Sequence, residues 1–177
     1  MKKLLIATAV IIAVMGLGTG SASAADNSLK AGTFGFNVGF GDSALGEPGV
    51  VMITGKYLVQ SDLAVLAGFG MQASSGDVES DFFGFTAGVR KYLKVGDFAP
   101  FIGGKISYEK EENDPNGIDR TVIDIAAVFG AEYFLHKQFS IEGSIGLGFG
   151  TVENEAPNTD YTYFGTRTVG VSANFYF

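Results

Sequence analysis

The chain has 177 residues, a length that fits one domain, and its 26 Gly show no Gly-X-Y period of the kind that indicates collagen. The absence of Cys excludes disulfides and thiolate metal sites. The net charge of −7 argues against nucleic acid as a partner, because phosphate binding requires clustered Lys and Arg.

The first 24 residues predict a cleaved signal peptide. Lys2 and Lys3 form a basic start, residues 4–17 are apolar, and Ala22 and Ala24 fit the small-residue cleavage pattern. The apolar stretch is shorter than the roughly 20 residues that cross a bilayer as a helix. An N-terminal membrane anchor is the alternative. Cleavage would leave residues 25–177 as one exported domain.

The rest of the chain alternates apolar residues with small or polar ones. In residues 139–150, for example, Ile141 and Ile145 occupy one phase while Glu142 and Ser144 occupy the other. A period of two is typical of strands with one apolar face. In chain order, the alternation predicts strands near residues 33–40, 49–58, 63–72, 82–93, 99–109, 121–133, 139–151 and 161–177.

The connections between these strands alternate in length. Short turns are expected at 59–62, 94–98 and 134–138, and longer polar loops at 41–48, 73–81, 110–120 and 152–160. This pattern is typical of an all-β, eight-stranded, antiparallel up-and-down transmembrane β-barrel. A soluble barrel with an apolar interior is the alternative. Small residues on the polar faces favour the membrane barrel, because eight strands enclose a lumen only wide enough for side chains.

Charged residues also fall in the phase that would face the lumen. Burying a charge costs several kcal/mol unless it is paired, so we expect these residues to form a network that plugs the lumen. A gate that admits small ions, and hence a narrow channel, is the alternative. The set contains three cations and three anions: Lys56, Arg90, Lys105, Asp124, Glu132 and Glu142.

The last strand carries the most specific pattern, an apolar alternation that ends on the C-terminal Phe: Val169, Val171, Ala173, Phe175 and Phe177, with Tyr161 and Tyr163 in the same phase. Together with the export signal and the eight amphipathic strands, it resembles the small outer-membrane barrels. These include the barrel domain of outer membrane protein A, outer membrane protein X and the opacity-type surface proteins.

The resemblance implies a place in the bacterial outer membrane, in contact with its lipid and lipopolysaccharide. It also implies that the terminal strand is an assembly signal read by the barrel assembly machinery. The function that it implies is a structural or surface-interaction role, in adhesion or envelope integrity.

Catalytic residues are scarce. The single histidine, His136, lies in a short turn, with Ser140 and Glu142 near in sequence. Some similar barrels deacylate lipid A with a Ser-His-acid arrangement, but lipid A occupies the outer leaflet and short turns face the periplasm. The glycines of residues 146–150 lie within a strand and do not form a nucleotide site. The sequence predicts no enzyme activity, cofactor or metal, with a lipid A-modifying enzyme as the alternative.

The predicted long loops are acidic, and only Lys110 and Arg120 offset their charge. They are candidates for binding an extracellular ligand. Residues 111–119 are rich in oxygen ligands but lack the spacing of an EF-hand loop. They either keep the surface soluble or bind a cation that bridges to lipopolysaccharide phosphates. The acidic residues are Asp42, Glu47, Asp77, Glu79, Asp81, Glu111, Glu112, Asp114, Asp119, Glu153, Glu155 and Asp160.

Overall fold

The computed structural model describes residues 27–40, 51–74, 79–114, 119–155 and 159–177. The predicted signal peptide lies outside them. The described residues form eight strands: β1 (Phe34–Phe40), β2 (Val51–Gln60), β3 (Leu63–Ser74), β4 (Glu79–Tyr92), β5 (Phe98–Asp114), β6 (Arg120–His136), β7 (Phe139–Asn154) and β8 (Thr159–Tyr176).

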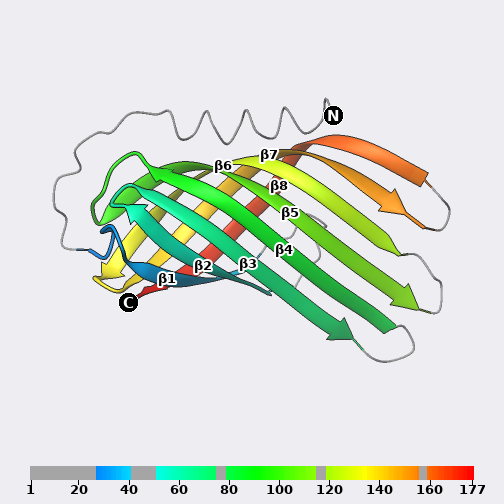
Figure 1. Cartoon of the computed structure of the whole chain (residues 1–177), viewed down its shortest axis with the longest axis horizontal. Helices are drawn as coiled ribbons and strands as arrows, with labels where there is room; N and C mark the ends of the chain where they lie inside the picture. Colours follow the sequence, from blue (N-terminus) through cyan, green and yellow to red (C-terminus); the bar gives the residue numbers. More distant parts are fainter. Residues whose placement is uncertain (1–26, 41–50, 75–78, 115–118, 156–158) are drawn as a thin grey trace.

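Each strand pairs antiparallel with its neighbour in sequence, and β1 pairs with β8, which closes the barrel. This confirms the predicted fold. Figure 1 shows the strands side by side at a common tilt, with the described start of the chain and the C-terminus at the same end. We call this end, which carries the connections 61–62, 93–97 and 137–138, the short-turn end, and the opposite end the loop end. In the described part of the chain, no helix is long and apolar enough to cross a membrane.

The outer face of the barrel is an apolar belt. Large apolar side chains are exposed there on all eight strands, which is far more apolar surface than a soluble monomer exposes. A surface of this kind is stable in contact with lipid. Members of the belt include Phe34, Ile53, Val65, Phe69, Phe85, Ile106, Ile123, Phe129, Ile145, Leu147 and Val169.

The height of the belt matches a bilayer. On β5, exposed aromatic side chains mark its two edges, Phe98 near the short-turn end and Tyr108 toward the loop end. Roughly ten residues at a rise of about 3.3 Å and a tilt of about 40° span about 25 Å, the height of the apolar band in outer-membrane barrels. Beyond Tyr108, the same face carries Lys110 and Glu112.

The strands extend further toward the loop end than the sequence predicts. Predicted loops 73–81, 110–120 and 152–160 begin and end as strand, and the ladder still pairs Glu111 with Arg120 and Glu153 with Asp160. The predicted boundaries were wrong because they stopped where apolar alternation stops. Backbone pairing continues beyond the belt, where water allows polar side chains on both faces.

A β-bulge in β8 changes which side chains face outward. Gly146 pairs with Thr168 and Leu147 with Thr166, so β8 contains one extra residue there. A bulge of this kind reverses the phase of the strand. Val169 to Phe177 keep the predicted outward alternation, but Phe164 is outside and the Tyr163 hydroxyl donates to Asp124 in the lumen. The prediction that Tyr161 and Tyr163 share the phase of Phe177 was therefore wrong.

Candidate functional site

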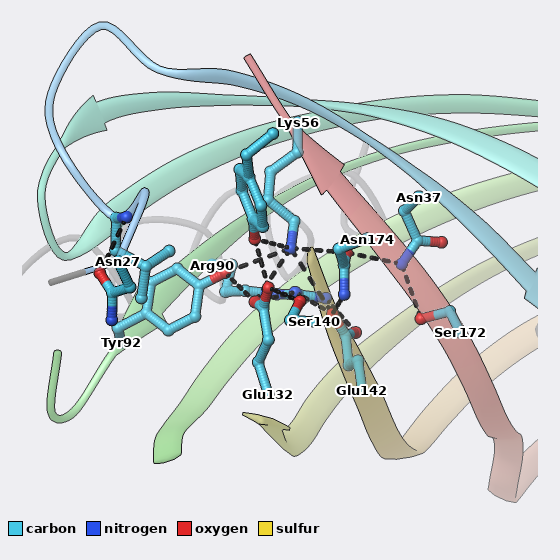
Figure 2. A network of polar contacts seen from close by, with 12 residues as sticks. Asn27, Asn37, Lys56, Arg90, Tyr92, Glu132, Ser140, Glu142, Ser172 and Asn174 are labelled. Carbon is cyan, nitrogen blue, oxygen red and sulfur yellow. Dashed lines mark hydrogen bonds and ion pairs between the residues drawn. The ribbon is translucent and has the colours of Figure 1, made fainter. Parts of the chain in front are cut away.

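Four of the six predicted lumen charges meet inside the barrel near the short-turn end. Figure 2 shows Lys56 of β2, Arg90 of β4, Glu132 of β6 and Glu142 of β7 converging across the lumen. Arg90 donates two hydrogen bonds to the Glu142 carboxylate, of 2.6 and 2.7 Å. The Lys56 ammonium lies 3.1 Å from Glu132 and 3.5 Å from Glu142. We call these four residues the charge network.

Strand register explains why two carboxylates share this place. Glu132 and Glu142 are direct partners in the β6–β7 ladder, and both point into the lumen. Like charges opposite each other on a sheet are destabilising. Lys56, within 4 Å of both carboxylates, and Arg90, which also lies 3.9 Å from Glu132, supply the compensating positive charge.

Glu132 is fully buried, with a relative exposure of 0%. One of its oxygens accepts hydrogen bonds from the hydroxyls of Ser140 and Tyr176, and the other accepts from Lys56 and, at 2.7 Å, from Tyr92. Four donors satisfy the acceptor sites of an ionised carboxylate. Glu132 is therefore the centre of the charge network.

Polar and aromatic side chains connect the charge network to further strands. The Asn174 carbonyl on β8 accepts from Lys56 and from Asn37 of β1, at 2.9 Å each. The Arg90 guanidinium lies 3.8 Å from the ring centre of Phe101 on β5, a cation–π contact. With Tyr92, these contacts join side chains of β1, β2, β4, β5, β6, β7 and β8.

Sequence reasoning missed Tyr92, Ser140, Asn174 and Tyr176 as members of this site. The sequence contains a signal for them. Tyr92 and Ser140 each lie two residues from a predicted lumen charge, and Asn174 and Tyr176 lie two residues apart, all in the inward phase of their strands. Glu109 was also missed. It is buried inside the barrel, at the end of the β5 range that the alternation predicted, so the lumen contains a fourth anion.

Lys105 and Asp124, the other two predicted charges, lie further toward the loop end. Asp124 accepts a hydrogen bond from Tyr163, and Lys105 lines a cavity of about 60 Å³. Arg90 and Glu142 line the same cavity, whereas Glu132 does not. A polar space of this size holds several waters at roughly 10–15 Å³ each. Arg90 and Glu142 therefore border a space with room for water, and Glu132 does not line it.

An apolar cluster lies between the charge network and the short-turn end. It is contributed by the strand ends, the turn 93–97 and the segment before β1, and its tyrosines are those that bind Glu132. The cluster consists of Leu29, Leu58, Ala64, Tyr92, Val95, Ala99, Phe101, Phe134 and Tyr176.

The residues considered for catalysis are kept apart. Ser140 points into the lumen and donates to Glu132, while His136 is exposed at the end of β6. The His136 Nδ1 atom accepts only a long contact of 3.5 Å from the backbone of Gln138. A nucleophile needs its base within hydrogen-bond reach, so these side chains do not form a Ser-His-acid arrangement.

Acidic side chains are exposed at the loop end, among them Asp81, Glu112, Glu153, Glu155 and Asp160. Asp42, Glu47, Asp77 and residues 115–118 of the segment considered for cation binding lie outside the described residues. In the part of the chain that is described, no group of three or more acidic or histidine side chains could hold a metal ion.

The predicted assembly residues lie on the outer face where the barrel closes. Phe175 and Phe177 of the C-terminal end both stack on Phe36 of β1, with ring centres 5.1 and 6.0 Å apart. The Phe177 backbone N–H also donates to the Phe34 carbonyl at 2.8 Å. The terminal strand is thus held to β1 by aromatic as well as backbone contacts.

Comparisons with known proteins agree with the β-barrel fold described above. The chain is similar in structure to Neisserial surface protein A, with 15% identity, a TM-score of 0.52 and coverage of 82% of this chain and 95% of that one. It is also similar to the N-terminal β-barrel domain of Pseudomonas aeruginosa OprF, with 12% identity, a TM-score of 0.50 and coverage of 83% and 98%. These likenesses show the fold. A comparison with curated protein sequences found no relative.

A family model described as "Outer membrane protein beta-barrel domain" matches residues 9–175, nearly the whole chain. The closed barrel, its apolar belt and this match agree on the bacterial outer membrane as the location. The chain belongs to the outer membrane protein β-barrel domain family.

Proposed function

We propose that the protein is a plugged outer-membrane barrel with a structural or surface-interaction role, in envelope integrity or adhesion. The observation that carries this proposal is the charge network, which joins opposite walls of the lumen through ion pairs shorter than 4 Å. Side chains bonded across a lumen hold the wall in one shape and leave little room for a solute. A rigid, filled barrel suits the display of loops better than transport.

The loop end supports the surface-interaction part of the proposal. Outer-membrane barrels have their short turns in the periplasm. In that orientation, the exposed acidic side chains of the loop end face the medium or the lipopolysaccharide layer. We infer that this surface meets lipopolysaccharide or an extracellular ligand, and that the terminal strand meets the barrel assembly machinery. Neisserial surface protein A, a structural relative, is by its name also a surface protein.

The proposal includes the absence of enzyme activity, since Ser140 and His136 are separated as described. A narrow channel is the second candidate, because the cavity beside Arg90 and Lys105 is a space in the lumen that directly adjoins the charge network.

Single-channel recording of the refolded protein in planar bilayers tests the plug against the channel. We expect no resolved current steps from the wild type, and current steps from a variant that combines Arg90→Ala, Glu132→Ala and Glu142→Ala. Lys94→Ala, which changes an exposed turn residue, is the matched control and should be silent. Stable current steps from the wild type would overturn the plug in favour of the channel.

Binding of the folded barrel to lipopolysaccharide and to host matrix proteins tests the surface role. We expect binding to one of these classes, and weaker binding by a variant that combines Glu153→Gln with Glu155→Gln, which removes the carboxylates without adding positive charge. Lys94→Ala at the opposite end is again the control. No binding to either class would remove the support for a surface-interaction role and leave the structural one.

A further inference from the structure

We infer that residues 27–33, which we call the strap, form a separate stopper that controls access to the lumen from the short-turn end. This goes beyond the proposed function, because it concerns how the plug can open from one side. The strap precedes β1 and contains no strand.

Hydrogen bonds attach the strap to three different hairpin ends. The Asn27 side-chain amide donates to the Gly96 carbonyl at 2.8 Å, in the turn between β4 and β5. The backbone N–H and hydroxyl of Ser28 both donate to the Lys137 carbonyl, in the turn between β6 and β7. The Gly32 N–H donates to the Leu58 carbonyl on β2 at 2.8 Å. The strap therefore crosses the mouth of the barrel.

Leu29 is the part of the strap that fills the lumen. Its relative exposure is 2%, and it belongs to the apolar cluster with Tyr92 and Tyr176. The hydroxyls of these two tyrosines bind Glu132. Leu29 is thus the outermost layer of a stack that continues through the tyrosine rings to the centre of the charge network.

Gly32 and Thr33 are bonded to Leu58 of β2, but the part of the strap before Gly32 can leave its place without disrupting the barrel wall. Its bonds to Gly96 and Lys137 are made to turns, outside the ladders that close the barrel. Gly32, with a φ of 86°, allows the chain to bend between that part and β1. Segments held by few bonds and two buried side chains, here Asn27 and Leu29, open locally at lower free energy than the strands do.

Thiol labelling can measure this opening, because the chain contains no Cys. Ala99→Cys places one thiol in the apolar cluster, at a site with 0% exposure, behind the strap. Thr86→Cys places a thiol at the cavity on the other side of the charge network. The probe is a small, charged methanethiosulfonate added to the folded protein in detergent.

In the Ala99→Cys background, Leu29→Ala should increase the labelling rate about tenfold or more, since local opening sets access to a buried group. The same change should leave the rate in the Thr86→Cys background within about twofold, because this thiol is reached from the loop end. Lys30→Ala, which changes an exposed strap residue, is the matched control and should alter neither rate.

If Leu29→Ala leaves the labelling rate of the Ala99→Cys thiol unchanged, the proposal that the strap is a stopper is overturned. Acceleration of both thiols to the same extent would also overturn it, because it would indicate loosening of the whole barrel. If Leu29→Ala does not fold, Asn27→Ala combined with Ser28→Ala keeps Leu29 and weakens only its attachment. Faster labelling of the Ala99→Cys thiol in that variant supports the stopper, and an unchanged rate contradicts it.

Discussion

Arg90 and Glu142 form a bidentate ion pair in the lumen, in which Arg90 Nη1 donates to Glu142 Oε2 and Nη2 donates to Oε1. Two parallel bonds fix orientation as well as distance, which a Lys at position 90 could not do. The residue types at these positions thus matter beyond their charge.

Arg90→Ala should destabilise the folded barrel by about 1–3 kcal/mol, as measured by urea unfolding in detergent or lipid. Leaving a buried charge without its partner costs about 3–5 kcal/mol. The expected loss is smaller here, because the cavity beside Glu142 gives water access to its carboxylate once the Arg90 side chain is removed. The control Lys94→Ala should change stability by less than about 0.5 kcal/mol. An Arg90→Ala effect no larger than the control would contradict the pairing.

Glu132→Gln provides a sharper test. From the sequence alone it is expected to be milder than Arg90→Ala, because the amide keeps the volume of the side chain. The contacts reverse this expectation, since Glu132 accepts four hydrogen bonds and an amide nitrogen would face two of those donors. Glu132 does not line the cavity that Arg90 and Glu142 border. We expect a loss of about 2–4 kcal/mol in the same urea assay. A loss smaller than that of Arg90→Ala would show that the donors rearrange.

Among the strands, alternation alone predicts most of what the structure shows. The apolar phase identifies all eight strands and the face of each that meets lipid. It fails in two places for physical reasons. Strand ends such as 110–114 continue as backbone pairing after the apolar signal has ended. The bulge in β8 is invisible in the sequence, because both phases around Thr166 and Thr168 contain plausible outward residues.

Two glycines in neighbouring strands form a matched test of the two faces. A Cβ added at Gly130 of β6 would lie 2.5 Å from both the Gly143 carbonyl oxygen and the ring of Phe101, which holds Arg90. At Gly143 of β7, no atom lies within 4 Å of an added Cβ. Gly130→Ala should therefore destabilise the barrel by about 1–3 kcal/mol in urea unfolding, because it overpacks the lumen.

Gly143→Ala should be neutral or stabilise by up to about 1 kcal/mol, because it reduces the freedom of the unfolded chain without a clash. Equal effects of the two substitutions would mean that the assignment of inner and outer faces is incorrect.

Deletion of Phe177 tests the terminal strand. The deletion removes one backbone bond to Phe34 and one ring stacked on Phe36. We expect a several-fold lower level of folded protein in the outer membrane, measured on unboiled gels of membrane fractions. Export should be unchanged. Phe164→Ala, on the same strand and exposed on the same outer face, is the control and should fold normally. Outer-membrane levels equal to the wild type would contradict this role.

At the scale of the whole molecule, the lumen is layered along its axis. The strap and apolar cluster are followed by the charge network, the cavity and then the residues around Asp124 and Tyr163. Sequence phase predicts which charges point inward, and their distance from the predicted short turns predicts a similar depth for Lys56, Arg90, Glu132 and Glu142. Meeting depends on the stagger between strands, which places Glu132 directly opposite Glu142 and leaves Lys105 and Asp124 further along the lumen.

A set of combined substitutions tests most directly whether the charge network acts as one unit. Arg90→Ala, Glu132→Ala and Glu142→Ala would be measured singly, in pairs and together by urea unfolding of the folded barrel. Residues that share contacts show coupling of about 0.5–3 kcal/mol, so the triple variant should lose less stability than the sum of the three single losses. Lys94→Ala added to each variant should be additive within about 0.5 kcal/mol. Strict additivity across the three network positions would contradict the charge network as the element that holds the lumen closed.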